Sequence, residues 1–211
     1  MAHKCFISFK KEDQKYREEI DKLFDESDVI NKGLDKRINS SDGDYIMKKI
    51  REDYLKDSTV TLFLIGEHSS ENEGFDSLGQ DKNYFIKKEL QSSLYNGQGN
   101  TRNGILGVVL PSMYDRIYKG TYTCPTCGKS HNHVSINDST VIKEFSENYY
   151  LEPHSGCAWS EEERYCILVK WDDFINNPEK YINDAFEKRS SELSEKVHVN
   201  INRGNVIKRY W

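Results

Sequence analysis

The chain has 211 residues, of which 31% are charged and 36% hydrophobic, and its formal net charge at pH 7 is -5. This length accommodates one domain with a sizeable core, or a small domain that carries an insertion. The composition describes a well-solvated protein without a general attraction to nucleic acid or anionic lipid, and no apolar run approaches the roughly 18 residues of a membrane span.

The first quarter of the chain alternates a short apolar run with amphipathic segments. Residues 4–9, KCFISF, are typical of a buried strand, and a charged turn follows them directly. Apolar residues at helical spacing predict a helix over residues 13–25, and the ambiguous segment 29–38 has room for a weak second strand. A polar loop at residues 40–44 then offers N-cap residues to a second helix.

The middle of the chain carries the clearest pattern of strand, helix and strand. Residues 59–65, TVTLFLI, form a continuous, β-branched apolar run that ends at a glycine, which is typical of a strand buried on both faces. A long polar loop over residues 66–80 leads to an amphipathic helix over residues 82–95. The run GILGVVL at residues 104–110 predicts the next strand.

Two further elements follow an irregular stretch. The run YCILVKW, residues 165–171, predicts a fifth strand, and residues 174–196 predict a terminal helix with Pro178 near its first turn. Strands that alternate with helices indicate βαβ units and a parallel sheet. We therefore predict an α/β fold with an open, doubly wound parallel sheet of about five strands, whose ligands gather at the carboxyl ends of the strands.

The helix predicted over residues 82–95 places one carboxylate, Glu89, on the flank of its apolar stripe. The stripe consists of Phe85, Ile86, Leu90 and Leu94. A carboxylate in this position is partly desolvated, which raises its pKa unless a partner offsets the effect. A lone glutamate there is also explained as a rim residue whose stem packs on apolar surface. The neighbouring strands favour a functional role, because this helix begins at the sheet edge where ligands gather.

Motifs of other ligand-binding α/β folds are missing. The sequence contains no GxGxxG or P-loop in the right context, since the GQG at residues 97–99 follows a helix rather than a strand. A response-regulator domain would need an acidic pair after the first strand and an aspartate at the end of the third. Glu12 and Asp13 fit the first requirement in part, but the third strand ends in IGE, residues 65–67.

Three features in order resemble the Toll/interleukin-1 receptor (TIR) domain: FISF with a charged turn, then TVTLFLIG, then an aromatic residue four positions before a glutamate. More narrowly, the chain resembles the bacterial TIR-like branch that includes the Thoeris anti-phage defence proteins. The matching parts run from about residue 4 to residue 110 and resume at the fifth strand. The resemblance implies one domain over residues 1–211 with the strand order 2-1-3-4-5. The chain departs from the family at Lys10, often an arginine, and at Phe85, often a tryptophan.

The resemblance also implies an enzymatic function. Many bacterial TIR domains cleave the nicotinamide–ribose bond of NAD, and some return a cyclised ADP-ribose as a second messenger for a separate effector. The catalytic glutamate of the family corresponds to Glu89, and Ser8, Phe9, Lys10 and Phe85 correspond to the NAD pocket. Within that pocket we expect Lys10 to meet a phosphate and Phe85 to pack against the ribose or a base.

The chemistry of NAD cleavage explains why a single carboxylate suffices. Cationic nicotinamide is already a good leaving group, so the reaction needs no general acid, unlike glycoside hydrolysis with its two carboxyl groups. An anionic Glu89 would bind the ribose hydroxyls and stabilise an oxocarbenium-like transition state. The expected partners are NAD, a downstream effector reached through a diffusible nucleotide, and a phage-derived trigger. A homo-oligomer is left open, and neither a membrane nor a nucleic acid is expected.

Residues 113–163 form an insertion before the last strand, and they contain a second candidate site. The sequence CPTCG, residues 124–128, is a knuckle whose CxxC spacing suits tetrahedral zinc. Few contiguous apolar residues surround it, so we expect the insertion to need a metal as a staple. The predicted ligands of this structural zinc are Cys124, Cys127, His154 and Cys157, with His131 and His133 as competitors for the histidine position. The alternative is a set of unliganded or redox-active cysteines.

The number and positions of the cysteines indicate the cellular compartment of the protein. The chain has five cysteines, an odd number, and Cys5 and Cys166 fall within predicted strands, where core packing is their expected role. This usage argues against a disulfide framework and for a reducing compartment. The first residues, MAHKCFISF, also lack the apolar run of a signal peptide. We therefore expect a cytoplasmic protein.

Two competing functions remain open at this point. The first is a TIR-type scaffold without catalysis, in which Glu89 is a helix-rim residue and the insertion binds a protein. The second is a nucleic-acid binder that uses the zinc insertion, although the acidic residues of residues 144–163 outweigh the basic ones. Incubation with NAD separates an enzyme from both of these.

Overall fold

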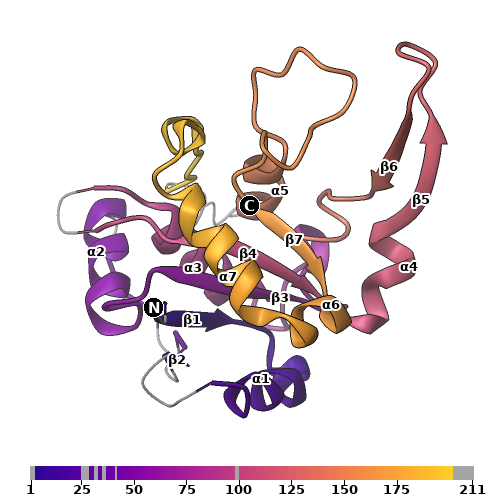
Figure 1. Ribbon diagram of the computed structural model, residues 1–211. Coiled ribbons are helices and arrows are strands. Elements are labelled where there is room, and N and C mark those ends of the chain that lie inside the picture. The colour runs from indigo at the N-terminus through magenta and orange to yellow at the C-terminus, as the bar shows by residue number, and fades with distance from the viewer. Residues whose placement is uncertain are drawn as a thin grey trace, which may run out of the picture.

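The computed structural model describes residues 3–24, 29–30, 33–34, 37–40, 42–97 and 100–201. Five parallel strands form the main sheet in the order β2-β1-β3-β4-β7 (Figure 1). This order confirms the predicted arrangement 2-1-3-4-5, since β7 is the fifth strand of this sheet along the chain. The strands are β1 (Cys5–Ser8), β2 (Val29–Ile30), β3 (Val60–Ile65), β4 (Gly104–Val109) and β7 (Ile167–Lys170).

Helices cover both faces of the sheet, as the doubly wound prediction requires. One face packs against α2 (Gly43–Asp53), α3 (Tyr84–Leu94) and α5 (Lys143–Tyr149). The other face packs against α1 (Gln14–Asp21), α6 (Trp171–Asn176) and α7 (Pro178–Lys188). Short 3-10 helices connect these elements: η1 (Lys11–Asp13), η2 (Glu71–Glu73), η3 (Pro111–Met113) and η4 (Glu192–Lys196).

The central strand β3 shows why its sequence does not alternate in polarity. All six residues of β3 are buried. Phe63 and Ile65 belong to the core under α3 and α5, whereas Leu62 and Leu64 belong to the core under α1, α6 and α7. Side chains of a strand point alternately to the two faces, so a strand covered on both faces needs apolar residues throughout.

The C-terminal region differs from the single helix predicted over residues 174–196. Helix α6 starts earlier, at Trp171, and ends at Asn176, and α7 starts at Pro178. Proline lacks a backbone N–H and prefers the first turn of a helix, so Pro178 begins a new helix rather than continuing the old one. Helix α7 ends at Lys188, and η4 is a separate short element.

The insertion consists of a projecting part and a packed part. Helix α4 (Tyr114–Ile117) leads into a hairpin of β5 (Tyr118–Thr123) and β6 (Ser130–Val134), which extends away from the main sheet (Figure 1). The following residues return to the core, contrary to the expectation that the insertion has little core of its own. Val141, Ile142, Phe145, Tyr149 and Leu151 are buried in the cluster under α3.

A glycine in β4 makes room for this packed part. A Cβ atom added at Gly107 would lie 2.5 Å from the ring of Phe145, which is far inside van der Waals contact. The lack of a side chain at Gly107 therefore lets α5 approach the sheet closely.

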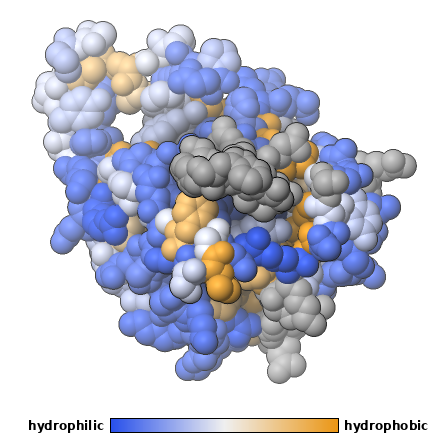
Figure 2. Space-filling view, turned by 180° about the vertical axis from the view of Figure 1, so that it is seen from behind, coloured by the Kyte–Doolittle hydropathy of each residue, from blue (hydrophilic) through white to orange (hydrophobic). Residues whose placement is uncertain are grey.

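The surface agrees with the charged composition. The face opposite to that of Figure 1 is mainly hydrophilic, with small, separated apolar areas (Figure 2). Within the described residues, no helix is both long and apolar enough to cross a membrane.

Candidate functional site

A pocket of about 500 Å³ opens at the carboxyl end of β1. Its lining comes from four places: β1 with the turn that follows it, the first half of α1, Gly33 and Leu34 after β2, and the segment of α3 with Lys82 before it. The position is the sheet edge at which open parallel sheets bind their ligands.

Glu89 lies in the wall of this pocket and is held at both carboxylate oxygens. The Ser8 hydroxyl donates a hydrogen bond of 2.7 Å to Oε2, and the backbone N–H of Leu34 donates one of 2.8 Å to Oε1. The residue is only 4% exposed. Two donors from distant parts of the chain thus fix the direction of the carboxylate.

The surroundings of Glu89 change its acidity. Burial raises the pKa of Glu89 from 4.5 to about 7, and the hydrogen bonds from Leu34 and Ser8 oppose this rise. No lysine, arginine or histidine of the described chain forms an ion pair with Glu89. Its negative charge is therefore available to a cationic ligand.

The rest of the pocket lining is rich in positive charge. Lys10, Lys11, Arg17 and Lys82 all line it, and Glu12 is the one other acid among the described lining residues. Lys10 donates a hydrogen bond of 2.7 Å from Nζ to the backbone oxygen of Lys82, which joins the two sides of the opening. A buried carboxylate with several cations around it suits a ligand that combines a cationic group with anionic groups.

The loop before α3 is attached to the insertion. Glu71 accepts a hydrogen bond of 3.1 Å from the backbone N–H of Lys143, and its own N–H donates to the Val141 oxygen at 3.0 Å. Glu71 also forms an ion pair of 2.9 Å with Lys87 of α3. The insertion, the loop and the helix that carries Glu89 are therefore one connected structure.

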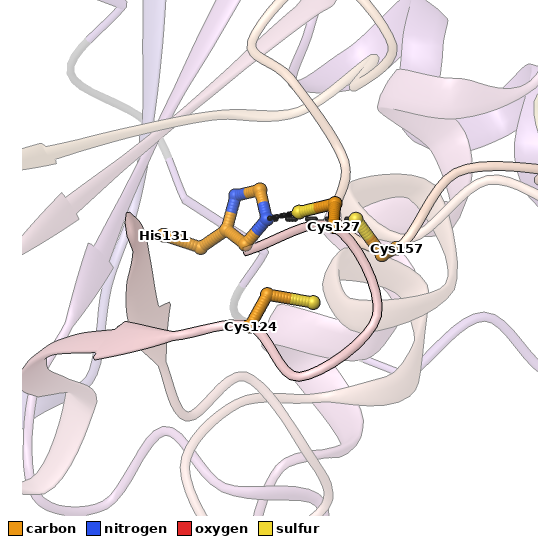
Figure 3. Close-up of side chains that lie close together, drawn as sticks. All are labelled: Cys124, Cys127, His131 and Cys157. Atoms are coloured by element: carbon orange, nitrogen blue, oxygen red, sulfur yellow. Dashed lines mark hydrogen bonds between the residues drawn. The ribbon is translucent and has the colours of Figure 1, made fainter. Parts of the chain in front are cut away.

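A second cluster lies where the hairpin meets the loop before β7. One ligand atom from each of Cys124, Cys127, His131 and Cys157 lies within 4.8 Å of all the others (Figure 3). His131 Nε2 is 3.1 Å from the Cys127 sulfur and 3.5 Å from the Cys157 sulfur. Three sulfurs and one imidazole nitrogen are a donor set that zinc prefers.

The backbone conformation of residues 124–129 suits the cluster to metal binding. The Gly128 N–H donates to the Cys124 oxygen at 2.8 Å, and the Cys124 N–H donates to the Lys129 oxygen at 2.8 Å, which closes the knuckle. Gly128 has φ +70, a conformation that glycine adopts without strain. Backbone N–H groups of Cys127 and Thr126 point at the Cys124 sulfur and lower the pKa of Cys124 to about 6. The knuckle thus favours the thiolate form that binds metal.

A comparison with known families identifies the part of the chain that holds the pocket. The model of the family described as Thoeris protein ThsB, TIR-like domain, matches residues 6–115. This match covers more than half of the chain. The chain belongs to this family.

The match to the Thoeris TIR-like family covers the Glu89 pocket and not the cysteine cluster. Residues 6–115 include most of β1, all of α3 and all of β4, whereas the hairpin and the loop before β7 lie beyond them. The match supports a TIR-like domain related to defence. The cysteine cluster lies outside the matched segment.

Four of the five residues predicted for the NAD site of this TIR-like domain line one pocket. Phe9, Lys10, Phe85 and Glu89 are all part of its lining. Ser8 is instead fully buried behind Glu89, to which it donates its hydroxyl hydrogen. Ser8 therefore acts on the carboxylate rather than on a ligand directly.

Sequence reasoning missed Gly33 and Leu34. They lie in the ambiguous segment after β2, and the important group is the backbone N–H of Leu34, which carries no signature in the sequence. The one available signal was the glycine at position 33, which interrupts the apolar pattern of residues 29–38. A Cβ atom at Gly33 would be 3.4 Å from Glu89 Oε1, so this backbone passes close to the carboxylate.

The structure places His131, not the predicted His154, among the three cysteines. The ring of His154 stacks on Trp159 with centroids 4.0 Å apart, and neither ring nitrogen has a hydrogen-bond partner among the described residues, although Nε2 lies 3.9 Å from a Glu163 oxygen. His131 reaches the knuckle because β6 pairs with β5 in a register that sets His131 opposite Tyr122, two residues before Cys124. His133, the other competitor, contacts Tyr122 and lies outside the cluster.

Proposed function

We propose that this TIR-like domain cleaves the nicotinamide–ribose bond of NAD and makes an ADP-ribose-derived, linear or cyclic, signal nucleotide in anti-phage defence. The observation that carries the proposal is Glu89: a buried carboxylate with no ion-pair partner among the described residues, oriented by two hydrogen bonds, in a pocket of about 500 Å³ that lies mainly in the family-matched segment. An NAD glycohydrolase or an ADP-ribosyl cyclase needs such a group.

The reaction moves charge in a direction that an anion at this position favours. The bond between C1′ of the ribose and the nicotinamide nitrogen breaks, and its electron pair neutralises the nicotinamide ring. Positive charge then develops on the ribose, and the ionised Glu89 stabilises it in a site that excludes much of the water. Water, or a nucleophilic atom of the ADP-ribose itself, attacks C1′ and loses its proton to solvent.

The charges around the pocket fit the rest of the substrate. NAD carries a cationic ring at one end and two phosphates in its centre. In our proposal the ring and its ribose lie next to Glu89 and Phe85, and the phosphates lie toward Lys10, Lys11, Arg17 and Lys82. Lysine and arginine side chains bind phosphate by charge-assisted hydrogen bonds.

A scaffold without catalysis is the second candidate, and one observation favours it. Both oxygens of Glu89 already have partners inside the protein, so the residue also serves to hold β1, the segment after β2 and α3 together. In that case the protein would bind partners through its surface and leave NAD unchanged.

Incubation of purified protein with NAD separates the two candidates. Nicotinamide and the nucleotide products are measured by mass spectrometry, with and without an extract of phage-infected cells as the source of a trigger. We expect nicotinamide release, faster with the extract, together with an ADP-ribose product. A chain that releases no nicotinamide in either condition would be the scaffold.

The proposed chemistry also implies which partners the protein has and where in the cell it acts. A signal nucleotide acts on a separate downstream effector that it reaches by diffusion, and the activating cue derives from the phage. We place the protein in the cytoplasm, where its five cysteines, which form no disulfide with one another, stay reduced. Assembly into a homo-oligomer is a further proposal, which light scattering at several protein concentrations tests.

We also propose that Cys124, Cys127, His131 and Cys157 hold one structural zinc. Four protein ligands close the coordination sphere, which is typical of a structural rather than a catalytic zinc. The metal would join the hairpin to the loop before β7. Elemental analysis should find one equivalent of zinc in the wild type and none in Cys124→Ser/Cys127→Ser. Metal-free wild type with an ordered hairpin would contradict the site.

A further inference from the structure

A second pocket, of about 320 Å³, lies at the opposite edge of the sheet from Glu89. Arg102, two residues before β4, and Arg189, directly after α7, both line it. The Glu89 pocket is at the carboxyl end of β1, whereas this one is at the amino end of the parallel strand β4. The two pockets share no lining residue in the described part of the chain.

Positive charge accumulates around this second pocket. The buried Arg51 lies near Arg189: burial, and then the charge of Arg189, lower the pKa of Arg51 to about 10. Among the described residues, the acceptors of Arg51 are two neutral oxygens, at 2.7 Å each, of the Asn103 side chain and the Ser58 backbone. Over the described ranges, neither Arg51 nor the two lining arginines form an ion pair with a carboxylate.

Backbone oxygens fix the two lining arginines without using all of their donors. Arg102 donates from Nε to the Leu94 oxygen at the end of α3, and from Nη1 to the Ser194 oxygen. Arg189 donates from Nε to the Arg102 oxygen at 2.8 Å, and its guanidinium carbon lies 4.8 Å from the centre of the Phe186 ring. The bond to Leu94 caps the end of α3, and the bond to the Arg102 oxygen joins the end of α7 to the loop before β4.

The other donors of these two arginines are not used in this way. Among the described residues, neither Nη atom of Arg189 and not the Nη2 atom of Arg102 has a protein acceptor. Thr101 and Ser190 belong to the same lining, and the Ser190 hydroxyl donates to the Glu187 oxygen at 3.3 Å. Glu195, an exposed residue, is the one acid that the described lining contains.

We propose that this pocket binds a phosphate group, with the two Nη atoms of Arg189 as a bidentate fork and Arg102 Nη2 as a third donor. A phosphate matches the arginine fork in geometry, and its charge neutralises guanidinium groups that the protein leaves uncompensated. Thr101 supplies a further hydroxyl donor, and the Ser190 hydroxyl joins the shell by turning away from the Glu187 oxygen. The volume suits inorganic phosphate or a mononucleotide better than a dinucleotide. The site is independent of the proposed NAD cleavage.

The test uses the arginine Nε–Hε signals in NMR spectra of the full-length protein. Inorganic phosphate, AMP and adenosine are titrated at constant ionic strength, with chloride as the competing anion. We expect the Arg102 and Arg189 signals to shift saturably with phosphate and with AMP and to stay in place with adenosine. Tighter binding of AMP than of phosphate would identify a nucleotide as the better ligand of the same site.

Variants separate this pocket from the Glu89 pocket, which also carries cations. Arg189→Gln should weaken phosphate binding, followed at the Arg102 signal, at least ~10-fold, and Ser190→Ala should weaken it less. Lys10→Gln, in the other pocket, should leave the Arg102 shift unchanged. Thermal melting checks that each variant is folded. Shifts confined to Arg17, or equal affinity in Arg189→Gln and wild type, would overturn the proposal.

Discussion

The Ser8 hydroxyl donates a hydrogen bond of 2.7 Å to Oε2 of Glu89, across 81 positions of the sequence. This bond connects the last residue of β1 to the inner face of α3. It favours the ionised form of a carboxylate whose pKa burial raises to about 7. Ser8 is therefore a positioning residue, which acts on the substrate through Glu89.

Ser8→Ala should raise the pKa of Glu89 further, because the ionised form loses one donor. In the wild type we expect kcat/KM for NAD to rise with pH through about 7, as Glu89 ionises. In Ser8→Ala this inflection should move up by about one to two pH units, since a hydrogen bond to a charged group is worth roughly 1.5–3 kcal/mol. The measurement is the pH profile of nicotinamide release.

The matched control is Ser92→Ala. Ser92 is also a buried serine, on the same helix as Glu89, but it donates to the Met47 oxygen of α2 at 3.0 Å. Its removal should cost stability and leave the inflection in place. An unchanged pH profile in Ser8→Ala would mean that Ser8 does not act through Glu89.

The raised pKa of Glu89 also predicts how stability depends on pH. Between pH 4.5 and about 7 the folded protein keeps the Glu89 proton that the unfolded chain releases, so this residue's contribution to stability is lost as the pH rises. Relative to Glu89→Gln, the wild type should lose up to about 3 kcal/mol over this range. Urea unfolding of both proteins at pH 5 and pH 8 measures the difference. A difference that does not change with pH would contradict the buried, raised-pKa state.

The zinc ligands can be tested at the histidine position. His131→Ala should lose the metal or bind it much more weakly, because one of four ligands is gone. His154→Ala should keep one equivalent of zinc, although it loses the stacking contact with Trp159. Elemental analysis of the two purified variants decides between the histidines. Zinc retained in His131→Ala and lost in His154→Ala would reverse the assignment.

Gly107→Ala tests the packing of the insertion on the sheet. The added methyl group meets the Phe145 ring, so we expect a destabilisation of roughly 1–3 kcal/mol, the usual cost of overpacking. Phe145→Leu removes the ring atoms that clash, and the double variant should therefore be more stable than the sum of the single effects predicts. Denaturant unfolding of the four proteins measures this coupling. Additive effects would show that α5 does not pack on Gly107 as described.

The sheet could be predicted from the sequence because burial on both faces leaves a strong pattern. TVTLFLI and GILGVVL are continuous apolar runs of strand length, and the structure buries every residue of β3 and β4. The prediction of a single terminal helix was wrong because helical spacing continues across residue 177, whereas Pro178 starts a new helix. At this position the preference of proline for the first turn of a helix determined the boundary, and the spacing of apolar residues did not.

The site could be predicted only in part. Glu89 and Phe85 stand out on the helix because of their place beside the apolar stripe. The direction of Ser8 was also accessible, since Ser8 shares a strand face with Phe6, which packs in the cluster under α2. The Leu34 N–H could not be found, because any residue supplies a backbone donor. The choice of His131 over His154 depends on the register of the hairpin, which the spacing of cysteines and histidines does not determine.

The most direct test of the central claim compares NAD cleavage by the wild type, Glu89→Gln and Glu144→Gln. Glu144 is a matched control: it is a buried glutamate of α5 with a raised pKa, it lies outside the pocket lining, and it accepts a hydrogen bond of 2.8 Å from Gln91 of α3, the helix that carries Glu89. Each substitution removes a charge and keeps the volume. All three proteins are assayed with NAD and extract of phage-infected cells.

We predict that nicotinamide release falls at least ~10²-fold in Glu89→Gln, the scale for removing electrostatic support of a transition state. Glu144→Gln should remain within a few-fold of the wild type, provided that both variants melt as folded proteins. Release by folded Glu89→Gln at the wild-type rate would contradict the account, because the carboxylate at the centre of the pocket would then have no part in the chemistry.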